Sequence, residues 1–494
     1  MRQFGTFSVI GEFGILPATA SYNYRFATRV LFRVHACYWS LYFLAGIALA
    51  QAPSGDFLRC GDLSFLDELE AAGAVYRDAG TTGDALEILK SRGFNAVRLR
   101  IFHTPTEIRD GLDDMLALAG RARSLELGLV LDFHYSDTWA DPGQQAKPHA
   151  WATLSYTALR DSVKAYTQHV LAALKAQGTV PDIVQIGNEI TGGFLWNDGR
   201  VGGAFDTPLQ WRRLGELLQS ATAGVREVVG DSSRIMIHID RGGSPGVARW
   251  FFDHLVAEGV SFDLIGLSYY PWWHGPLEGF QATLDLLKER YRVPVFLAEV
   301  AYPWTLGWFD DTHNVVGLPE HLLPGFPATP QGQAAFLGAV VESLMGVAAQ
   351  GACYWAPDHV AAPRYGSPWE NLALFDDQGN VLPAAAALGG TQSVQRTIEA
   401  VQIGVVEAFP NPARDIIRIR FDNRSGECAQ IRVLDIVGRL RRTVPGGCVI
   451  GSAEIRMSMR GLSAGVYLFE IHAAKSGVLA RGKFVAAGGL GSSQ

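Results

Sequence analysis

The chain has 494 residues, too many for one ordinary domain but suited to a large α/β barrel with a smaller domain added. Its residues are 48% apolar and 18% charged, so it has ample material for a core and shows no sign of global disorder. The formal net charge of -7 argues against nucleic acid or an anionic membrane as a partner. It is compatible with a neutral sugar.

An export signal is predicted near the N-terminus. Arg29 and Arg33 precede an apolar run over residues 36–48, and small residues follow it. This order is typical of a cleaved signal peptide. The run is shorter than the roughly 20 apolar residues that span a bilayer, so cleavage is favoured over an uncleaved anchor. We expect residues 1–52 to form a leader and signal peptide, with the translation start nearer Arg29.

From about residue 56 to residue 388, short β-branched runs alternate with longer helical patterns, which indicates a parallel sheet built from βα units. Eight such strands predict a (β/α)8 TIM barrel, which we assign to residues 53–392. The predicted strands cover residues 58–63, 96–101, 128–134, 183–188, 234–239, 264–269, 295–299 and 353–356. The helical patterns include residues 156–174 and 211–228.

The composition and the pattern of predicted elements change after about residue 390. A patch rich in Ser, Thr and Gln is followed by short alternating strands with no helices between them. This pattern predicts a small all-β sandwich over residues 405–494, joined to the barrel by a linker over residues 393–404. The predicted strands cover residues 416–421, 431–436, 466–471 and 482–486.

Polar and aromatic residues gather at the carboxyl ends of most predicted barrel strands. The active sites of barrel enzymes lie at this end, so we expect these side chains to form one site. The residues are Arg98, Arg100, Asp132, His134, Asn188, Glu189, His238, Asp240, Tyr270, Glu299 and Trp355.

Two of these residues, Glu189 and Glu299, can carry the chemistry of a glycoside hydrolase. That reaction uses one carboxylic acid and one carboxylate across a sugar bond, and a retaining enzyme holds them about 5 Å apart. We assign Glu189 as the acid/base and Glu299 as the nucleophile. Asn188 is suited to bind the 2-hydroxyl of the sugar. The plainer alternative is that both glutamates only form salt bridges at the barrel rim.

The neighbours of the two glutamates suggest how their pKa values differ. Arg98 offers a fixed cation that would keep Glu299 ionised, and Tyr270 can donate a hydrogen bond to the same carboxylate. Glu189 would then hold its proton to higher pH.

Two histidines follow or precede an acidic residue at a spacing of two on their strands. Asp132 and His134 therefore point to the same side, and His238 and Asp240 repeat the pattern. We predict that all four form hydrogen bonds in the site, the alternative being histidines packed in the core.

Tryptophans are frequent in or just after the predicted strand ends, where flat rings can stack on sugar faces. Most tryptophans of a barrel belong to its core. We expect Trp355 and one of Trp272 or Trp304 to be sugar platforms, and we include Trp139 among the substrate-binding residues. The six candidates are Trp139, Trp196, Trp272, Trp273, Trp304 and Trp355.

Five cysteines occur, one of them in the predicted signal peptide, and none has the spacing of a metal site. Cys428 and Cys448 could form a disulfide in an oxidising compartment. Cys60 and Cys353 lie near the first and last predicted barrel strands. The plain expectation is buried thiols or one structural disulfide.

Several motifs resemble the endo-β-1,4-galactanases of glycoside hydrolase family 53. They are VRLR at 97–100, LDFHYSDTWADP at 131–142, IGNE at 186–189, IMIHID at 235–240, SYYP at 268–271 and LAE at 297–299. The resemblance implies an endo-acting, retaining enzyme that cleaves the β-1,4-galactan side chains of type I arabinogalactan in pectin. Another endo-glycanase, acting on mannan or β-glucan, and a non-catalytic sugar-binding barrel are the alternatives.

The resemblance implies no required cofactor but allows a structural calcium ion. In some bacterial relatives, calcium joins the loops after strands seven and eight. Here Asp310, Asp311, His313 and Asn314, with residues 367–371, could serve, and we take Asp311 and His313 as the candidates. A polar, solvated loop is the alternative.

The tail resembles the C-terminal sorting domain of type IX secretion cargo in the Bacteroidetes lineage. The segments are AFPNP at 408–412, VLDIVG at 433–438 and LSAGVYL at 462–468. The resemblance implies export through the periplasm to the cell surface or the medium. A carbohydrate-binding module is the alternative, but the tail sequence lacks the row of aromatic residues expected of such a module. We expect a monomer whose partners are the polysaccharide and the secretion machinery.

Overall fold

The computed structural model of the chain describes residues 57–106, 109–389, 404–423, 428–435, 439–447, 451–473 and 477–487. The predicted signal peptide and nearly all of the predicted linker lie outside these ranges. Within them, no helix has the length and apolar character that a membrane span requires.

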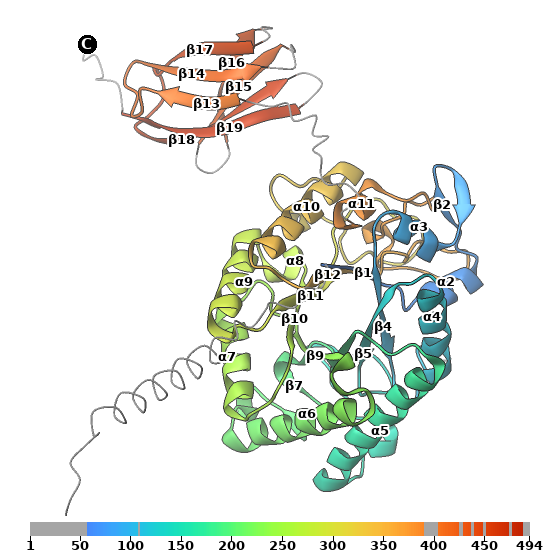
Figure 1. Ribbon diagram of the computed structural model, residues 1–494. Helices are drawn as coiled ribbons and strands as arrows, with labels where there is room; N and C mark the ends of the chain where they lie inside the picture. Colours follow the sequence, from blue (N-terminus) through green and yellow to red (C-terminus); the bar gives the residue numbers. More distant parts are fainter. Residues whose placement is uncertain are drawn as a thin grey trace, which may run out of the picture. The chain divides into compact units, whose positions relative to one another are not determined.

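Eight parallel strands close into a barrel in the order β1-β12-β11-β10-β9-β6-β5-β4, which confirms the predicted (β/α)8 fold (Figure 1). Each predicted strand coincides with an observed one to within two residues. The strands are β1 (Leu58–Asp62), β4 (Ala96–Ile101), β5 (Gly128–Phe133), β6 (Ile183–Ile186), β9 (Arg234–Ile239), β10 (Leu264–Tyr269), β11 (Val295–Val300) and β12 (Gly351–Trp355).

Helices surround the barrel (Figure 1). Several begin at a residue that satisfies free backbone N–H groups, since the side chains of Ser155, Thr207 and Thr329 each accept a hydrogen bond from the third residue beyond. The helices are α2 (Leu66–Ala72), α3 (Ala85–Ser91), α4 (Leu112–Ser124), α5 (Tyr156–Gln177), α6 (Pro208–Val229), α7 (Pro245–Ala257), α8 (Pro271–His274), α9 (Leu277–Tyr291), α10 (Pro330–Gly346) and α11 (Pro383–Gly389).

Two short hairpins complete the barrel domain, β2 (Tyr76–Asp78) with β3 (Thr81–Gly83), and β7 (Gly193–Phe194) with β8 (Gly199–Arg200). The barrel interior below the site is filled by one buried layer with a contribution from every strand. This layer comprises Cys60, Ala96, Val130, Ile183, Met236, Leu264, Phe296, Ala298 and Cys353. Such a layer makes the barrel a packed core rather than a pore.

The tail is an all-β sandwich, as predicted, with one sheet in the order β13-β14-β17 and another in the order β16-β15-β18-β19. It has its own core, which includes Ile419, Phe421, Val433 and Phe469. Cys428 is disulfide-bonded, and its predicted partner Cys448 lies outside the described residues. The strands are β13 (Gly404–Phe409), β14 (Ile416–Asn423), β15 (Ala429–Asp435), β16 (Leu440–Gly447), β17 (Gly451–Ser458), β18 (Gly465–Ala473) and β19 (Gly477–Ala486).

Candidate active site

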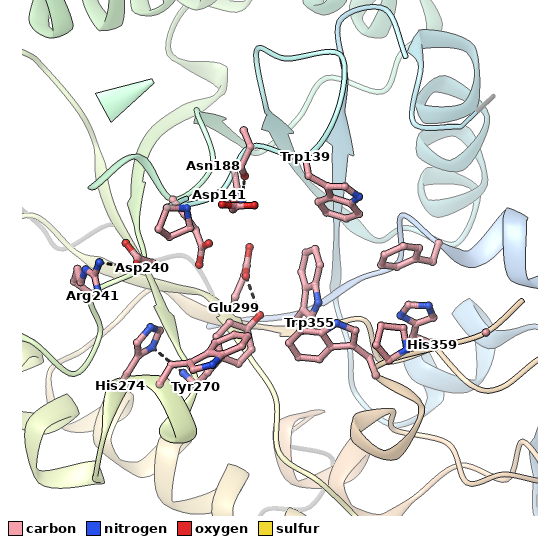
Figure 2. Close-up of a pocket in the computed structure, with 18 of the residues that line it drawn as sticks. Trp139, Asp141, Asn188, Asp240, Arg241, Tyr270, His274, Glu299, Trp355 and His359 are labelled. Atoms are coloured by element: carbon pink, nitrogen blue, oxygen red, sulfur yellow. Dashed lines mark hydrogen bonds and ion pairs between the residues drawn. The ribbon is translucent and has the colours of Figure 1, made fainter. Parts of the chain in front are cut away.

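A cleft of about 740 Å³ lies at the carboxyl ends of the barrel strands (Figure 2). Both predicted glutamates line it. Asp240 and Arg241 lie on one side of Glu299, and Trp355 and His359 lie on the other. The lining residues are Phe65, Trp139, Ala140, Asp141, Pro142, Asn188, Glu189, Asp240, Arg241, Tyr270, Trp273, His274, Glu299, Trp355, His359, Tyr365, Gly366, Pro368 and Trp369.

A layer of buried polar side chains forms the floor below the cleft. Its members lie two residues beyond the apolar interior layer, because side chains alternate between the faces of a strand. Arg98 donates from Nη1 to Asp62 Oδ2 at 2.7 Å, and from Nη2 to Asp132 Oδ2 at 2.8 Å. Its Nε donates to Gln185 Oε1 at 3.1 Å. Removing one partner of such a buried pair typically costs about 3–5 kcal/mol, so this network fixes the guanidinium.

Glu299, on β11, contacts the two neighbours that the strand-end pattern suggested. Nη2 of Arg98 lies 3.0 Å from Glu299 Oε1. Tyr270 Oη donates to Glu299 Oε2 at 2.8 Å (Figure 2). Burial raises the pKa of Glu299, while the Arg98 charge and the Tyr270 hydrogen bond oppose this rise. Burial and the nearby Glu299 carboxylate raise the pKa of Tyr270, so its hydroxyl remains a donor.

Glu189 follows β6 in a left-handed backbone conformation with φ of 49°, which is uncommon outside glycine and frequent at functional sites. Ser268 Oγ donates to Glu189 Oε1 at 2.6 Å, and His238 Nε2 lies 2.9 Å from Ser268 Oγ. Burial, together with Arg98, holds the pKa of His238 well below its usual value. The neutral imidazole therefore donates from Nε2 to Ser268, and its Nδ1 accepts from Gln185 Nε2 at 3.0 Å.

The two glutamates are close and differ in protonation. A carboxylate oxygen of Glu189 and one of Glu299 lie within 4.8 Å of each other. This distance is near the roughly 5 Å of retaining glycosidases and well below the roughly 6.5–9.5 Å of inverting ones. Burial and the negative charges of Glu299 and Asp240 raise the pKa of Glu189 well above its usual value. Because Arg98 stabilises the charge on Glu299, the proton of the pair resides on Glu189.

Asn188 is held in one orientation next to the glutamates. Its Oδ1 accepts from Arg98 Nη2 at 2.9 Å and lies 3.2 Å from Gln185 Nε2, and its Nδ2 donates to Ala140 O at 2.9 Å. An amide nitrogen has two hydrogens, so one remains for a ligand in the cleft.

Several residues that we predicted as substrate-binding lie in the floor and do not line the cleft. Asp132 accepts from Gln185 Nε2 at 2.6 Å and lies 3.1 Å from His134 Nε2, whose ring accepts a backbone hydrogen bond through Nδ1. Burial alone would raise the pKa of Asp132, but Arg98 and His134 outweigh it and hold the pKa below its usual value. Together with Arg98 and His238, these residues position the site, while Asp240 reaches the cleft itself.

The predicted aromatic residues also divide into those that line the cleft and those that do not. Trp139 and Trp355 line the cleft, and the Arg100 guanidinium stacks on Trp139 at 4.4 Å. Neither Trp272 nor Trp304 lines it. Trp304 instead packs parallel to Phe309 with ring centroids 5.4 Å apart, and its Nε1 donates to a backbone carbonyl, so the structure assigns it to loop packing.

Other residues of the site were not singled out from the sequence. Gln185 and Ser268 lie on the inner face of β6 and β10, and their period-two spacing from the strand ends could have indicated them. His359 and Trp369 lie in the long loop after β12, where no periodic pattern marks a position. Both ring nitrogens of His359 lack a hydrogen-bond partner within the described part of the chain, and the ring stacks on Phe65 at 4.3 Å.

The loop after β11 places polar groups differently from our calcium prediction. Asp311 and His313 are exposed, and His313 contacts the Trp308 ring. Glu370 Oε1 instead accepts from the Phe309 backbone N–H at 2.6 Å and from Asn314 Nδ2 at 3.4 Å. Among the described residues, the buried oxygens Glu370 Oε2 and Asn314 Oδ1 have no hydrogen-bond partner. The Asp310 carboxyl group also interacts with the Glu370 carboxyl group, so hard oxygens from two loops meet here, which fits a calcium ion.

A TIM barrel whose mouth holds two close carboxylic acids of unequal pKa, in a cleft rich in aromatic rings, defines a glycoside hydrolase. Residues 58–388 match the model of glycosyl hydrolase family 53. The chain belongs to this family. Residues 407–485 match the secretion system C-terminal sorting domain, which confirms the second resemblance and indicates export by the type IX system to the cell surface or beyond.

Individual known proteins are similar to the chain over about two thirds of its length. An arabinogalactan endo-β-1,4-galactanase of Cellvibrio japonicus is 35% identical and is matched over 69% of this chain and 93% of its own length. A protein of Niallia circulans, described as the uncharacterized protein in the bgaB 5' region, is 45% identical over 66% of this chain and 92% of its own. The solved catalytic domain of an Ignisphaera aggregans member of family 53 is 36% identical, with a TM-score of 0.63, over 68% of this chain and 97% of its own.

Proposed function

We propose that the chain is an exported, endo-acting and retaining β-1,4-galactanase that cleaves the galactan side chains of type I arabinogalactan in pectin. The observation that carries the retaining chemistry is the close pair Glu189 and Glu299, with its unequal environments. The choice of galactan rests on relatives that are named arabinogalactan endo-β-1,4-galactanases. No residue of the floor identifies galactose by itself.

The proposed reaction has two displacements. Glu299 attacks the anomeric carbon while Glu189 gives its proton to the departing glycosidic oxygen, and the bond to that oxygen breaks. Glu189, now ionised, takes a proton from water, whose oxygen attacks the same carbon and releases Glu299. The free amide hydrogen of Asn188 binds the 2-hydroxyl, a contact that strengthens in the transition state. Two inversions give overall retention.

The endo-acting mode follows from the shape of the cleft. It extends to both sides of Glu299, toward Asp240 and Arg241 and toward Trp355 and His359 (Figure 2). Sugar units can therefore bind on both sides of the scissile bond. An exo-acting enzyme closes one of these sides.

The test is to incubate the full chain with potato galactan, mannan and cellulose and to measure new reducing ends. We expect activity on galactan, with oligosaccharides as the first products and a β-anomer that precedes mutarotation in NMR spectra. Activity on mannan or cellulose without activity on galactan would contradict the substrate, and a first-formed α-anomer would contradict retention. No activity on any glycan would favour a sugar-binding barrel.

Export through the periplasm and a monomeric state are also proposed. The sorting-domain match supports the secretion machinery as a partner. Light scattering on the purified enzyme should give the mass of one chain, and a dimer mass would contradict the monomer.

We infer further that calcium binds between the loops after β11 and β12, at Asn314 and Glu370 rather than at Asp311 and His313. The ion would supply structural cross-linking and no chemical step. We expect EDTA to lower the melting temperature and added calcium to restore it. The Glu370→Gln variant should lose this response, and Asp311→Asn should keep it. An unchanged melting temperature in EDTA would contradict the site.

A further inference from the structure

Two buried thiols meet inside the barrel, directly below the active-site floor. Cys60 lies on β1 and Cys353 on β12, and both are 0% exposed. They are register partners on neighbouring strands, and their sulfur atoms are 2.7 Å apart. The reaction described above uses neither of them.

The position of this pair is special because β1 and β12 are the first and last strands of the barrel. Their pairing closes the sheet, and until it forms the barrel has two open edges. Two residues above the thiols in the same register, Asp62 lies beside Trp355. Asp62 is the partner that accepts from Arg98 Nη1. The seam of the barrel therefore supports the cation that stabilises Glu299.

We propose that Cys60 and Cys353 form a disulfide bond in the exported enzyme, which closes the barrel seam covalently below the active site. Residues directly opposed on paired strands have Cα atoms about 5 Å apart, within the range of about 4.4–6.8 Å that a disulfide requires. The proposal depends on export and not on the choice of sugar substrate.

The oxidation needs an acceptor, which is the disulfide of a thiol–disulfide oxidoreductase or of a small-molecule dithiol couple in the export compartment. One cysteine thiolate attacks that disulfide and forms a mixed disulfide, and the second attacks the first sulfur and releases the acceptor as a dithiol. The two thiols lose two protons and two electrons, and the acceptor gains them. The match to the secretion sorting domain supports maturation in an export compartment, where disulfides form and persist.

Burial determines when the bond forms and how it behaves afterwards. Because neither sulfur is exposed, an oxidoreductase reaches them only before β1 and β12 pair. Once the barrel has closed, the same burial protects the bond from reductants. The disulfide would enclose a long stretch of chain, and cross-links over long loops restrict the unfolded state most.

Peptide mapping of the exported full chain tests the proposal. The enzyme is denatured, treated with iodoacetamide without reductant, digested and analysed by mass spectrometry. We expect a linked peptide pair that contains Cys60 and Cys353, and no carbamidomethyl group on either residue. Reduction before alkylation should release both peptides and label both residues. Labelling of both residues without reduction, or linkage of either to another cysteine, would overturn the proposal.

A stability measurement gives an independent readout. The double variant Cys60→Ala/Cys353→Ala removes the bond and leaves the tail cysteines in place. We expect its melting temperature to fall by about 5–10 °C relative to the exported wild type. Unfolding and refolding the wild type in dithiothreitol should lower its melting temperature by a similar amount, and the double variant should respond much less. Equal responses of the two proteins to dithiothreitol would also overturn the proposal.

Discussion

Neighbouring groups give two chemically identical side chains, Glu189 and Glu299, different protonation states. Glu299 contacts Arg98 and accepts from Tyr270, and both contacts favour its charge. Among the described residues, the direct side-chain partner of Glu189 Oε1 is the neutral Ser268 hydroxyl. The floor network therefore acts on catalysis by placing a positive charge nearer to one carboxylate than to the other.

Replacing either glutamate with glutamine should lower kcat by several orders of magnitude. The Glu299 variant lacks the group that bonds to the anomeric carbon, and the Glu189 variant lacks the group that protonates the departing oxygen.

Azide separates the roles of the two glutamates on an activated aryl galactoside. With Glu299→Ala, azide takes the place of the nucleophile and should give an inverted, α-linked product. With Glu189→Ala, it should give a retained, β-linked product. The opposite pattern would reverse our assignment.

The pH dependence should be bell-shaped, with Glu299 ionised and Glu189 protonated at the optimum. Activity falls at low pH as Glu299 gains a proton, and at high pH as Glu189 loses one. Tyr270→Phe removes a hydrogen bond that lowers the pKa of Glu299, so the acidic limb of kcat/KM should move to higher pH. The rate at the optimum should fall about 10- to 100-fold. Tyr354→Phe removes a buried hydroxyl without contact to either glutamate and should leave the limb in place.

The sequence predicted the groups that end a strand, and it could not predict which groups meet across strands. Glu189, Glu299, Arg98 and Tyr270 follow from strand ends alone. The hydrogen bonds that connect Ser268 to His238 and to Glu189 depend on the register of β9 with β10. No local sequence pattern specifies this register. The orientation of an aromatic side chain in a loop, such as Trp304, depends on the residues against which the loop packs, and the sequence does not specify these.

At the scale of elements, the end of β6 positions the acid/base. The predicted strand continued to residue 188, but β6 ends at Ile186 because Gly187 adopts φ of 82°. This turn points Asn188 and Glu189 into the cleft. A Cβ on Gly187 would lie 2.6 Å from Ile190 Cγ2, so the close approach also requires glycine.

Gly187→Ala should therefore lower both stability and kcat, the latter by more than tenfold, because the backbone that carries Glu189 must move. Gly178 provides the matched control, since it has φ of 81° at the end of α5 and open space around it. Gly178→Ala carries the same left-handed strain of roughly 1–2 kcal/mol but no clash. It should lower the melting temperature slightly and leave kcat unchanged. Equal kinetic effects in both variants would contradict the role of the turn.

The barrel strands were predictable because parallel strands, buried on both faces, appear as continuous apolar runs. The sandwich strands were harder. β16 contains Pro445 and two glycines, which are unfavourable in a strand, and our prediction did not include it. β13 and β17 were also not included. Their pairing with β14 supplies the structure that their own sequences only weakly indicate.

At the scale of the whole molecule, catalysis and export belong to separate cores. The described side chains of the cleft and its floor all come from the barrel, and the sandwich core shares no residue with the barrel clusters. The change from βα repeats to helix-free strands predicted this division from the sequence. The sugar could not be predicted in this way, because a floor that binds one ionised carboxylate is common to enzymes that act on different glycans.

Deleting residues 404–494 should therefore abolish export and leave kcat/KM on galactan within twofold of the full chain. The physical reason is that the deletion removes a complete core that shares no residue with the barrel core. Immunoblots of cells and medium measure export, and reducing-end assays on protein purified from the cytoplasm measure catalysis. The full-length Glu299→Gln chain is the reciprocal control, expected in the medium but inactive. A truncated chain that is exported normally would contradict the sorting role of the tail. A truncated chain that folds but has lost most of its activity would show that the sandwich contributes to the site.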